Sequence, residues 1–288
     1  MTTSITSSTT QTIISAGGNP SALVIENGGI VSGIGKNKII NGNFAINQRA
    51  VSGTVVLAAG AYGHDRFKAG ASGCTYTFAT LENITTITIS AGSLIQVIEG
   101  LNLMSGPVVL SWEGTAQGKI GAGAYGNSGV TGTAVGGTDL SVEFNTGTLS
   151  LVQLETGSYK SAFEHRPYGM ELSLCQRYYF RVRSTQALNV RFVPGFNRTT
   201  TTANFIIPFP VYMRSNPTAL EQSGNAAAYA VAYLTGIISC NTVPVFTSAL
   251  EYCAVVSFSV AGGLTAGQGV AATFISNLNG YLGWSTEL

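Results

Sequence analysis

Apolar and polar residues alternate with a period of two along most of the chain after Lys38. Residues 86–89 read Thr-Ile-Thr-Ile, and residues 140–144 read Leu-Ser-Val-Glu-Phe, a pattern typical of strands buried on one face. The Gly-rich segment 114–137 breaks the alternation and predicts a long turn system. Two strand faces are expected in the preceding segment, one formed by Val108, Leu110 and Trp112 and the other by Val109, Ser111 and Glu113.

The same alternation returns in the last third of the chain. It predicts strands at residues 205–209, 229–233, 253–260, 270–275 and 280–284. Pro208 and Pro210 place the first of these strands at a sheet edge or a bulge, because proline cannot donate to a neighbouring strand. The pattern therefore predicts an all-β protein with two β-domains.

One segment, residues 171–179, has a helical period instead. Leu172, Cys175 and Tyr179 stand at i, i+3 and i+7, and Leu174 and Tyr178 at i and i+4. Because Pro167 and Gly169 precede this run of helix formers, we expect a short helix that links the two β-domains.

The N-terminal region differs from the rest of the chain. Residues 2–12 are Ser or Thr except for Ile5 and Gln11, and short apolar groups separated by glycines follow. Such a segment has too few apolar residues for a core of its own. We expect short strands or an extended arm that contacts neighbouring chains, and the absence of heptads excludes a coiled-coil shaft.

Composition agrees with an all-β protein and limits the partners. Charged residues make up 9% of the chain and glycines number 36 in 288, which suits strands joined by tight turns better than surface helices. The net charge of +1 leaves no basic stripe for nucleic acid, whereas a neutral, hydroxyl-rich surface fits carbohydrate or protein. No secretory signal is evident, and the longest apolar run, residues 226–238, is too short for membrane insertion.

The four cysteines have no metal-binding spacing. Four cysteines allow three disulfide pairings, but we favour four buried thiols in a chain that folds in a reducing cytoplasm. The cysteines are Cys74, Cys175, Cys240 and Cys253.

The sequence contains partial matches to catalytic motifs, but the neighbouring residues do not support a catalytic role for them. Residues 121–126 match GxGxxG, but the Asn-Ser-Gly that follows cannot open the helix that a dinucleotide site needs, so a β-loop is favoured. With only His64 and His165, and no GxSxG, a nucleophile activated by histidine or a zinc site is not expected.

Glycoside hydrolysis stays open as an alternative, because it requires only two carboxylates about 5–10 Å apart. Four carboxylates of the first β-domain qualify by position: Glu113, Asp139, Glu143 and Glu155. Glu113 and Glu143 fall on strand faces opposite the apolar residues, which is the usual place of a solvated carboxylate. We therefore expect binding and not catalysis.

Aromatic side chains are the expected platform for sugar rings. Tyr62, Trp112 and Tyr125 lie in or near the turns of the first domain, and Tyr281 and Trp284 lie near the end of the second. Each is a candidate glycan-binding residue, with packing in the core or between subunits as the alternative. For Trp112 and Trp284 packing is favoured.

Several segments together resemble bacteriophage tail-fibre and tail-spike proteins that carry a carbohydrate-binding-module-like jelly roll. For the jelly roll they are residues 37–49 (NKIINGNFAINQR), 61–67 (AYGHDRF), 152–157 (VQLETG), 163–169 (FEHRPYG) and 174–179 (LCQRYY). Residues 209–217 and 280–288 are similar to the C-terminal β-sandwich of such proteins. The resemblance covers residues 37–288.

The resemblance implies a homotrimer on the virion, made in the bacterial host cytoplasm. Its expected parts are an attachment arm at 1–36, a jelly roll at 37–168, a linking helix at 169–179 and a β-sandwich for trimerisation or receptor binding at 180–288. The arm would bind other virion proteins through its apolar residues Ile5, Ile13, Ile14, Leu23, Val24 and Ile25.

The resemblance also implies a host partner and an ion. The jelly roll would bind host cell-surface glycan, and related jelly rolls often hold a structural calcium near residues that correspond to Asn43 and Glu155. No other cofactor is expected. The short arm keeps two alternatives open: a structural capsid or tail decoration fibre without a host ligand, and a polysaccharide depolymerase.

Overall fold

The computed structural model describes residues 36–82, 84–184, 189–276 and 278–288, together with the backbone of four strands before residue 36. Strands make up 49% of the chain and helices 6%, with one α-helix among the described residues. The predicted all-β class is therefore confirmed. The chain divides into two compact units, residues 1–171 with Leu288 and residues 172–287.

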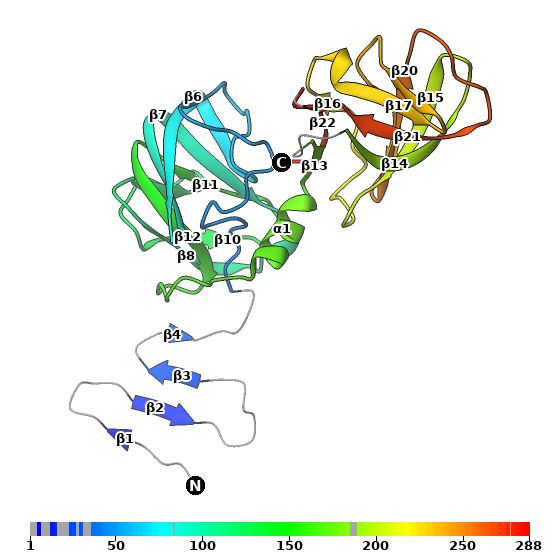
Figure 1. Ribbon diagram of the computed structural model, residues 1–288. Helices are drawn as coiled ribbons and strands as arrows, with labels where there is room; N and C mark the ends of the chain where they lie inside the picture. Colours follow the sequence, from blue (N-terminus) through cyan, green and yellow to red (C-terminus); the bar gives the residue numbers. More distant parts are fainter. Residues whose placement is uncertain are drawn as a thin grey trace. The chain divides into compact units, whose positions relative to one another are not determined.

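The four strands before residue 36 pair in chain order into one antiparallel sheet (Figure 1). The register sets Ile5 opposite Ile13 and Val24 opposite Ile14. The strands are β1 (Ile5–Thr6), β2 (Thr12–Ser15), β3 (Leu23–Glu26) and β4 (Gly29–Ile30). The side chains of the six predicted attachment residues lie outside the described part of the structure.

The first unit, shown in Figure 1, is a sandwich. It is built mainly from one continuous sheet in the order β10-β8-β12-β7-β11-β9, with β6 on β7 and β5 on β6. Strand β12 joins the two layers, because its residues 147–149 pair with β7 and its later residues with β8. The register shifts between Ser150 and Gln153, where Leu151 has a φ of 49°. A bulge of this kind lets a strand change layers. The strands are β5 (Val55–Leu57), β6 (Lys68–Leu81), β7 (Ile84–Ile98), β8 (Gly106–Glu113), β9 (Gly118–Ile120), β10 (Val130–Ala134), β11 (Leu140–Phe144) and β12 (Gly147–Thr156), with a 3-10 turn at Gly100–Asn102.

The interior of the first unit is aromatic and aliphatic. Val142 and Phe144 are fully buried, as the alternation in residues 140–144 predicts. The largest rings of this core are Phe44, Phe67, Tyr76, Trp112 and Phe144.

Two predictions for this unit are wrong. The segment 114–137 is not only a turn system, because β9 and β10 form within it and pair with β11 and β8. Strand β8 is also buried on both faces, since Val109 and Ser111 are 1% and 7% exposed. Ser111 lines a pocket together with residues 160–163, so that segment lies over the face that was expected to be solvated.

The predicted helix is present but begins and ends three residues earlier. Helix α1 spans Tyr168–Gln176, because the Glu171 amide already donates to the Pro167 carbonyl. Tyr179 starts a strand and pairs with Ser285, so the apparent helical spacing of Tyr178 and Tyr179 reflects their burial in a different element. The boundary between the two units falls inside α1.

The second unit contains a seven-stranded antiparallel sheet in the order β18-β17-β21-β14-β15-β20-β19 and a three-stranded sheet in the order β13-β22-β16. Its core includes Phe205, Tyr229, Phe258, Phe274 and Trp284. The strands are β13 (Tyr179–Arg183), β14 (Val190–Asn197), β15 (Thr202–Pro208), β16 (Glu221–Gln222), β17 (Tyr229–Tyr233), β18 (Gly236–Ser239), β19 (Val245–Leu250), β20 (Cys253–Ser259), β21 (Gly269–Phe274) and β22 (Tyr281–Ser285), with a 3-10 turn at Ala226–Ala228.

Pro208 ends an interior strand, but its local surroundings are those of an edge. Strand β14 pairs with β15 only as far as Phe205, whereas β20 continues along it to Pro208. The ring nitrogen, which cannot donate a hydrogen bond, therefore lies on the side without a paired strand.

The four cysteines are free thiols, in agreement with the sequence. Cys74, Cys175 and Cys240 are buried, whereas Cys253 is half-buried on β20 instead of fully buried as expected. Burial raises the pKa of Cys74 to about 11 and that of Cys240 to about 12, which keeps both thiols protonated and unreactive near neutral pH.

In the described part of the chain, helices are too short or too polar to cross a membrane.

Candidate functional site

A pocket of about 650 Å³ lies in the first unit, where three parts of its sequence meet. The loop after residue 40 contributes Asn43, the turn between β6 and β7 contributes Glu82, and the segment at the start of α1 contributes His165 and Tyr168. Two of these parts belong to the segments 37–49 and 163–169, on which the expected relationship to tail fibres is based. The structure thus places the two segments on one concave surface.

Arg166 holds the two segments together. Its Nη1 donates to the Ile39 carbonyl at 2.9 Å, and its Nη2 donates to the Asn37 carbonyl. In the opposite direction, the Asn37 amide donates to the Glu164 carboxylate at 2.7 Å. Because these bonds bind the backbone of one segment to the side chains of the other, they fix the register between them.

Glu171, in the first turn of α1, completes this connection. Its side chain is 9% exposed, and its Oε1 accepts from Arg166 Nη1 at 3.2 Å and from the Asn41 amide. The side chain of Asn41 in turn bonds to both the amide and the carbonyl of Ile46, at 2.9 and 2.8 Å. The loop that carries Asn43 is therefore closed at both of its ends.

Backbone strain gathers around this pocket. Asn41, Phe44 and Glu82 have φ angles of 62°, 53° and 50°, in the left-handed region that non-glycine residues rarely adopt. Each such residue costs ~1–3 kcal/mol and persists only where its surroundings hold it, which is common at binding sites.

The lining offers the groups that bind sugars. Tyr168 is 64% exposed and presents an aromatic surface. The amide of Asn43 and the hydroxyl of the exposed Thr80, which lies 2.9 Å from the hydroxyl of the buried Thr85, can exchange hydrogen bonds with sugar hydroxyls. His165 is exposed, and its ring packs edge-on against Phe163 with centroids 4.9 Å apart. An aromatic face with convergent polar groups is the usual composition of a small-molecule site.

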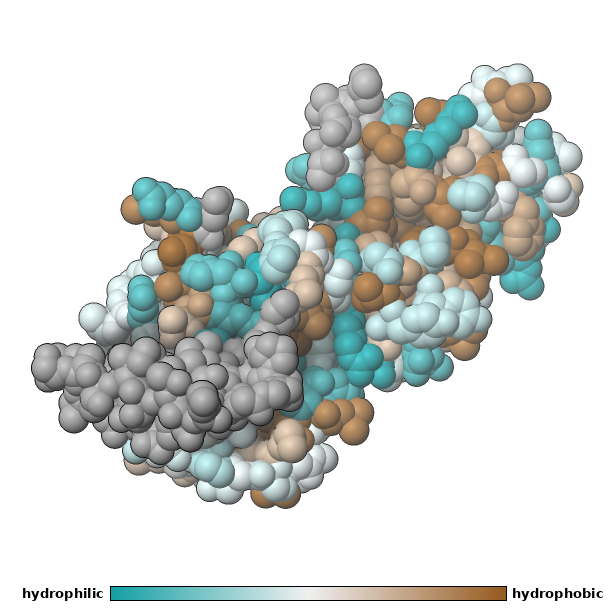
Figure 2. Space-filling view, turned by 90° about the horizontal axis from the view of Figure 1, so that it is seen from below, coloured by the Kyte–Doolittle hydropathy of each residue, from teal (hydrophilic) through white to brown (hydrophobic). Residues whose placement is uncertain are grey.

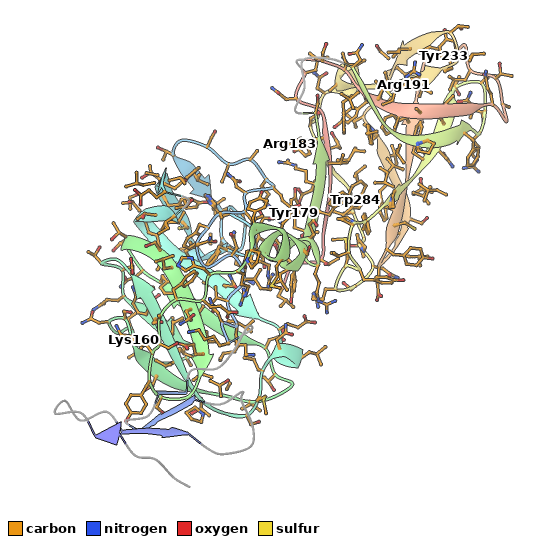
Figure 3. The ribbon with its side chains drawn as sticks, turned by 60° about the horizontal axis from the view of Figure 1, so that its bottom comes forward. Lys160, Tyr179, Arg183, Arg191, Tyr233 and Trp284 are labelled. Atoms are coloured by element: carbon orange, nitrogen blue, oxygen red, sulfur yellow. The ribbon has the colours of Figure 1, made fainter. Side chains whose placement is uncertain are left out.

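Two predicted glycan-binding residues are instead core residues. Trp112 is 5% exposed, its ring packs edge-on against Phe144, and its Nε1 donates to the Ala116 carbonyl at 2.9 Å. Trp284, labelled in Figure 3, is fully buried and stacks on Phe180 with centroids 6.0 Å apart. Neither ring offers a face to a ligand, which agrees with the packing that the sequence favoured for both residues.

The other three predicted aromatic residues each have a cation over the ring. Arg49 lies 5.2 Å from the Tyr62 centroid, Lys119 lies 4.9 Å from that of Tyr125, and Arg181 lies 3.4 Å from that of Tyr281. These cations already occupy the position that a sugar would take on that ring face. Tyr62, Tyr125 and Tyr281 do not line the pocket.

Glu143 belongs to a polar cluster on the sheet surface with Ser93, Lys119 and Tyr125. Its carboxylate accepts from Ser93 Oγ at 2.6 Å and pairs with Lys119 Nζ at 2.9 Å. Burial raises the pKa of this carboxyl. The hydrogen bonds from Ser93, Lys119 and Tyr125 together lower the pKa by more than burial raises it, so the pKa falls below its usual value. Burial, followed by the bond to Glu143, raises the pKa of Tyr125 to about 12. A carboxyl held ionised does not suit the general acid of a glycosidase.

Two more of the four carboxylates considered for hydrolysis are used in structural bonds. Asp139 accepts from the Gly100 amide at 2.7 Å, and Glu155 accepts from Gln153 at 2.8 Å and from the Ser161 amide at 3.0 Å. Glu113 is exposed, and two strands, β12 and β7, separate its strand from that of Glu143 in the sheet order. This arrangement does not favour a hydrolytic pair.

The two calcium candidates have different surroundings. Asn43 lines the pocket, whereas Glu155 is 5% exposed and paired with Lys36 Nζ at 3.7 Å. Within the described residues, no three His, Cys, Asp or Glu side chains cluster as metal ligands. The lysine and the hydrogen bonds already balance the charge of Glu155, so these residues do not fit a calcium ion.

A second pocket of about 320 Å³ lies over β8. Ser111, Glu113 and Lys160 line it, and Lys160 is at the surface (Figure 3). Its aromatic residues, Trp112 and Phe163, are buried or half-buried. It therefore lacks the exposed ring of the larger pocket.

Sequence reasoning missed Tyr168, His165 and Glu82 as candidate site residues. Tyr168 and His165 lie in the segment FEHRPYG, where an aromatic, a histidine and charged residues are unusually dense for this chain. That density was the available signal. Glu82 lies in a hairpin turn, and no sequence pattern around it indicated a binding residue.

Comparison of the chain with protein-family models, curated proteins and solved structures finds no match.

Proposed function

We propose that this chain is a bacteriophage virion fibre protein, a tail fibre or tail-tip adhesin, whose first unit binds a host surface glycan in the pocket beside Tyr168. The observation that carries the proposal is the meeting of the segments 37–49 and 163–169 around one exposed aromatic ring, an amide and a hydroxyl. In the proposal, the residues before 37 attach the fibre to other virion proteins.

The surface of the chain supports a role in binding neutral partners. On the face seen in Figure 2, hydrophobic and near-neutral side chains occupy much of the second unit, with hydrophilic residues between them. Only 9% of all residues are charged, so copies of the chain repel one another little. We propose that three copies associate, which would raise the effective concentration of three weak glycan sites on one fibre.

Binding to host cells tests the function. The full-length protein is expected to bind susceptible bacteria or their purified surface polysaccharide. Tyr168→Ala should weaken binding about tenfold or more per site, because it removes the aromatic platform. Tyr159→Ala is a matched control, since Tyr159 is 63% exposed and does not line the pocket. Sedimentation should give three times the chain mass.

A decoration fibre without a host ligand would behave differently. The wild-type protein would then bind no host polysaccharide, and labelled antibody would find it on the capsid instead of the tail tip. Equal binding by wild-type protein and Tyr168→Ala would show that the pocket beside Tyr168 is not the glycan-binding site. Release of reducing sugar from the polysaccharide would indicate a depolymerase.

A further inference from the structure

The charged groups that line the pocket are not equally available to a ligand. One guanidinium, Arg166, and two carboxylates, Glu82 and Glu171, contribute to the lining, which leaves one negative charge in excess when His165 is neutral. Arg166 donates to two main-chain carbonyls and to Glu171, and its side chain is 6% exposed. The cation of the pocket is therefore already used within the protein.

Glu171 is used in the same network. Its Oε1 accepts from Arg166 and from the Asn41 amide, and its Oε2 accepts from Arg166 at 3.3 Å. Its position in the first turn of α1 also offsets the partial positive charge at the N-terminus of that helix. Neither Arg166 nor the helix end thus provides free positive charge to a ligand.

Glu82 is in a different situation. It stands at the tip of the β6–β7 hairpin, is exposed, and lines the pocket. Its φ is 50°, an unusual backbone conformation that determines the direction in which its side chain leaves the turn. Glu143, Glu155, Glu164 and Glu171 each form an ion pair in the described part of the chain, and none of these pairs includes Glu82. Its negative charge is available to a bound ligand, and a concave site increases the effect of that charge over a flat surface.

From this charge distribution we infer that the pocket selects a glycan with a free, protonated amino sugar. The inference rests on the proposed glycan-binding function. The sugar ring packs on Tyr168, its ammonium group pairs with Glu82, and Asn43 and Thr80 bond its hydroxyls. A uronic or sialic acid meets the excess negative charge without an available lysine or arginine in the lining, and it binds more weakly.

Three oligosaccharides of equal length separate this inference from the proposed function. They are β-1,4-linked glucosamine, its N-acetylated form and oligogalacturonate, titrated calorimetrically into the full-length protein at pH 7. The wild-type protein should bind the amino form about fivefold or more tightly than the acetylated form, and the acidic form most weakly. Raising the salt concentration should reduce the difference between the amino and acetylated forms.

Two variants identify the group responsible. Glu82→Gln should lower the affinity for the amino form to nearly that of the acetylated form, with little change for the latter. Glu251→Gln makes the same charge change at an exposed position in the second unit and should leave all three affinities unchanged. Because Glu82 is exposed in a turn, its variant should fold, which circular dichroism checks.

The outcomes that overturn the two ideas differ. Acetylated or acidic oligomers that bind as well as the amino form, in a manner sensitive to Tyr168→Ala, would overturn the amino-sugar inference and leave the glycan site in place. A preference for the amino form that persists in Glu82→Gln would also overturn it. Absence of binding by all three oligomers and by host polysaccharide would overturn the proposed function itself.

Discussion

The guanidinium group of Arg166 donates to the main-chain carbonyl of Ile39 across 2.9 Å, although the two residues are 127 positions apart in the sequence. This bond joins the beginning of the first unit to the segment that leads into α1. The same guanidinium pairs with Glu171, so one side chain connects the loop, the segment and the helix around the pocket.

Replacement of Arg166 should strongly destabilise the first unit. Arg166→Ala leaves Glu171 buried without its charge partner and two carbonyls without donors, and removal of one member of a buried pair costs about 3–5 kcal/mol. Urea unfolding followed by circular dichroism measures this loss. Lys160→Ala, at an exposed position, should change the stability by less than about 0.5 kcal/mol. A loss of that small size in Arg166→Ala would contradict the connecting role.

The buried His64 should make the protein sensitive to acid. Its side chain is 2% exposed, its Nδ1 lies 3.0 Å from the Tyr76 hydroxyl, and burial lowers its pKa from 6.5 to about 4. The unfolded chain binds a proton below pH 6.5 and the folded chain does not. Stability is therefore retained above pH 6.5 and falls by about 1.4 kcal/mol per pH unit between pH 6.5 and 4, about 3 kcal/mol in total.

Urea unfolding across this pH range tests the role of His64. His64→Gln should lower the stability at pH 7 but flatten its decline between pH 6.5 and 4. His165→Gln, at the exposed histidine, should keep the steep decline. The same decline in His64→Gln as in the wild-type protein would assign the acid sensitivity to other groups.

Gly42 should not tolerate a side chain. A Cβ at this position would lie 2.1 Å from the Val152 carbonyl oxygen, which belongs to strand β12. Gly42→Ala must move one backbone against the other, at a cost of about 1–3 kcal/mol or more. Gly169→Ala is the matched control, because its Cβ meets no atom within 4 Å and alanine favours a helix, so stability should rise by about 0.5 kcal/mol. Thermal unfolding of both variants measures the difference.

Variants of Trp112 and Tyr168 should change different properties: the first should change stability and the second glycan binding. Trp112→Phe removes the bond from Nε1 to the Ala116 carbonyl and leaves space in the core, and we expect a loss of about 1–3 kcal/mol with unchanged glycan affinity. Tyr168→Ala, at a residue 64% exposed, should lose glycan affinity with little change in stability. Thermal unfolding and glycan titration on the same samples compare the two effects. If Trp112→Phe folded but lost glycan affinity, the Trp112 ring would have to contribute to glycan binding.

The sequence by itself determined the class of the fold and much of its local structure. Alternation in residues 140–144 predicted a strand with Val142 and Phe144 inside, and the structure buries both. The helical spacing after Pro167 predicted the helix that became α1. These predictions succeed because the period of apolar residues depends on the local backbone geometry, which neighbouring residues set.

Only the tertiary structure decided which of these elements meet. Periodicity shows that a residue faces an interior, but it does not show which strand lies opposite, and the order β10-β8-β12-β7-β11-β9 departs from the order in the chain. Trp112 and Tyr168 illustrate the result. Packing on Phe144 buries Trp112, whereas Tyr168 stays exposed at the start of α1. The pocket depends on bonds such as the one from Arg166 to Ile39. Such bonds form only when the folded sheets bring distant backbone groups within about 3 Å, a condition that no local pattern of residues records.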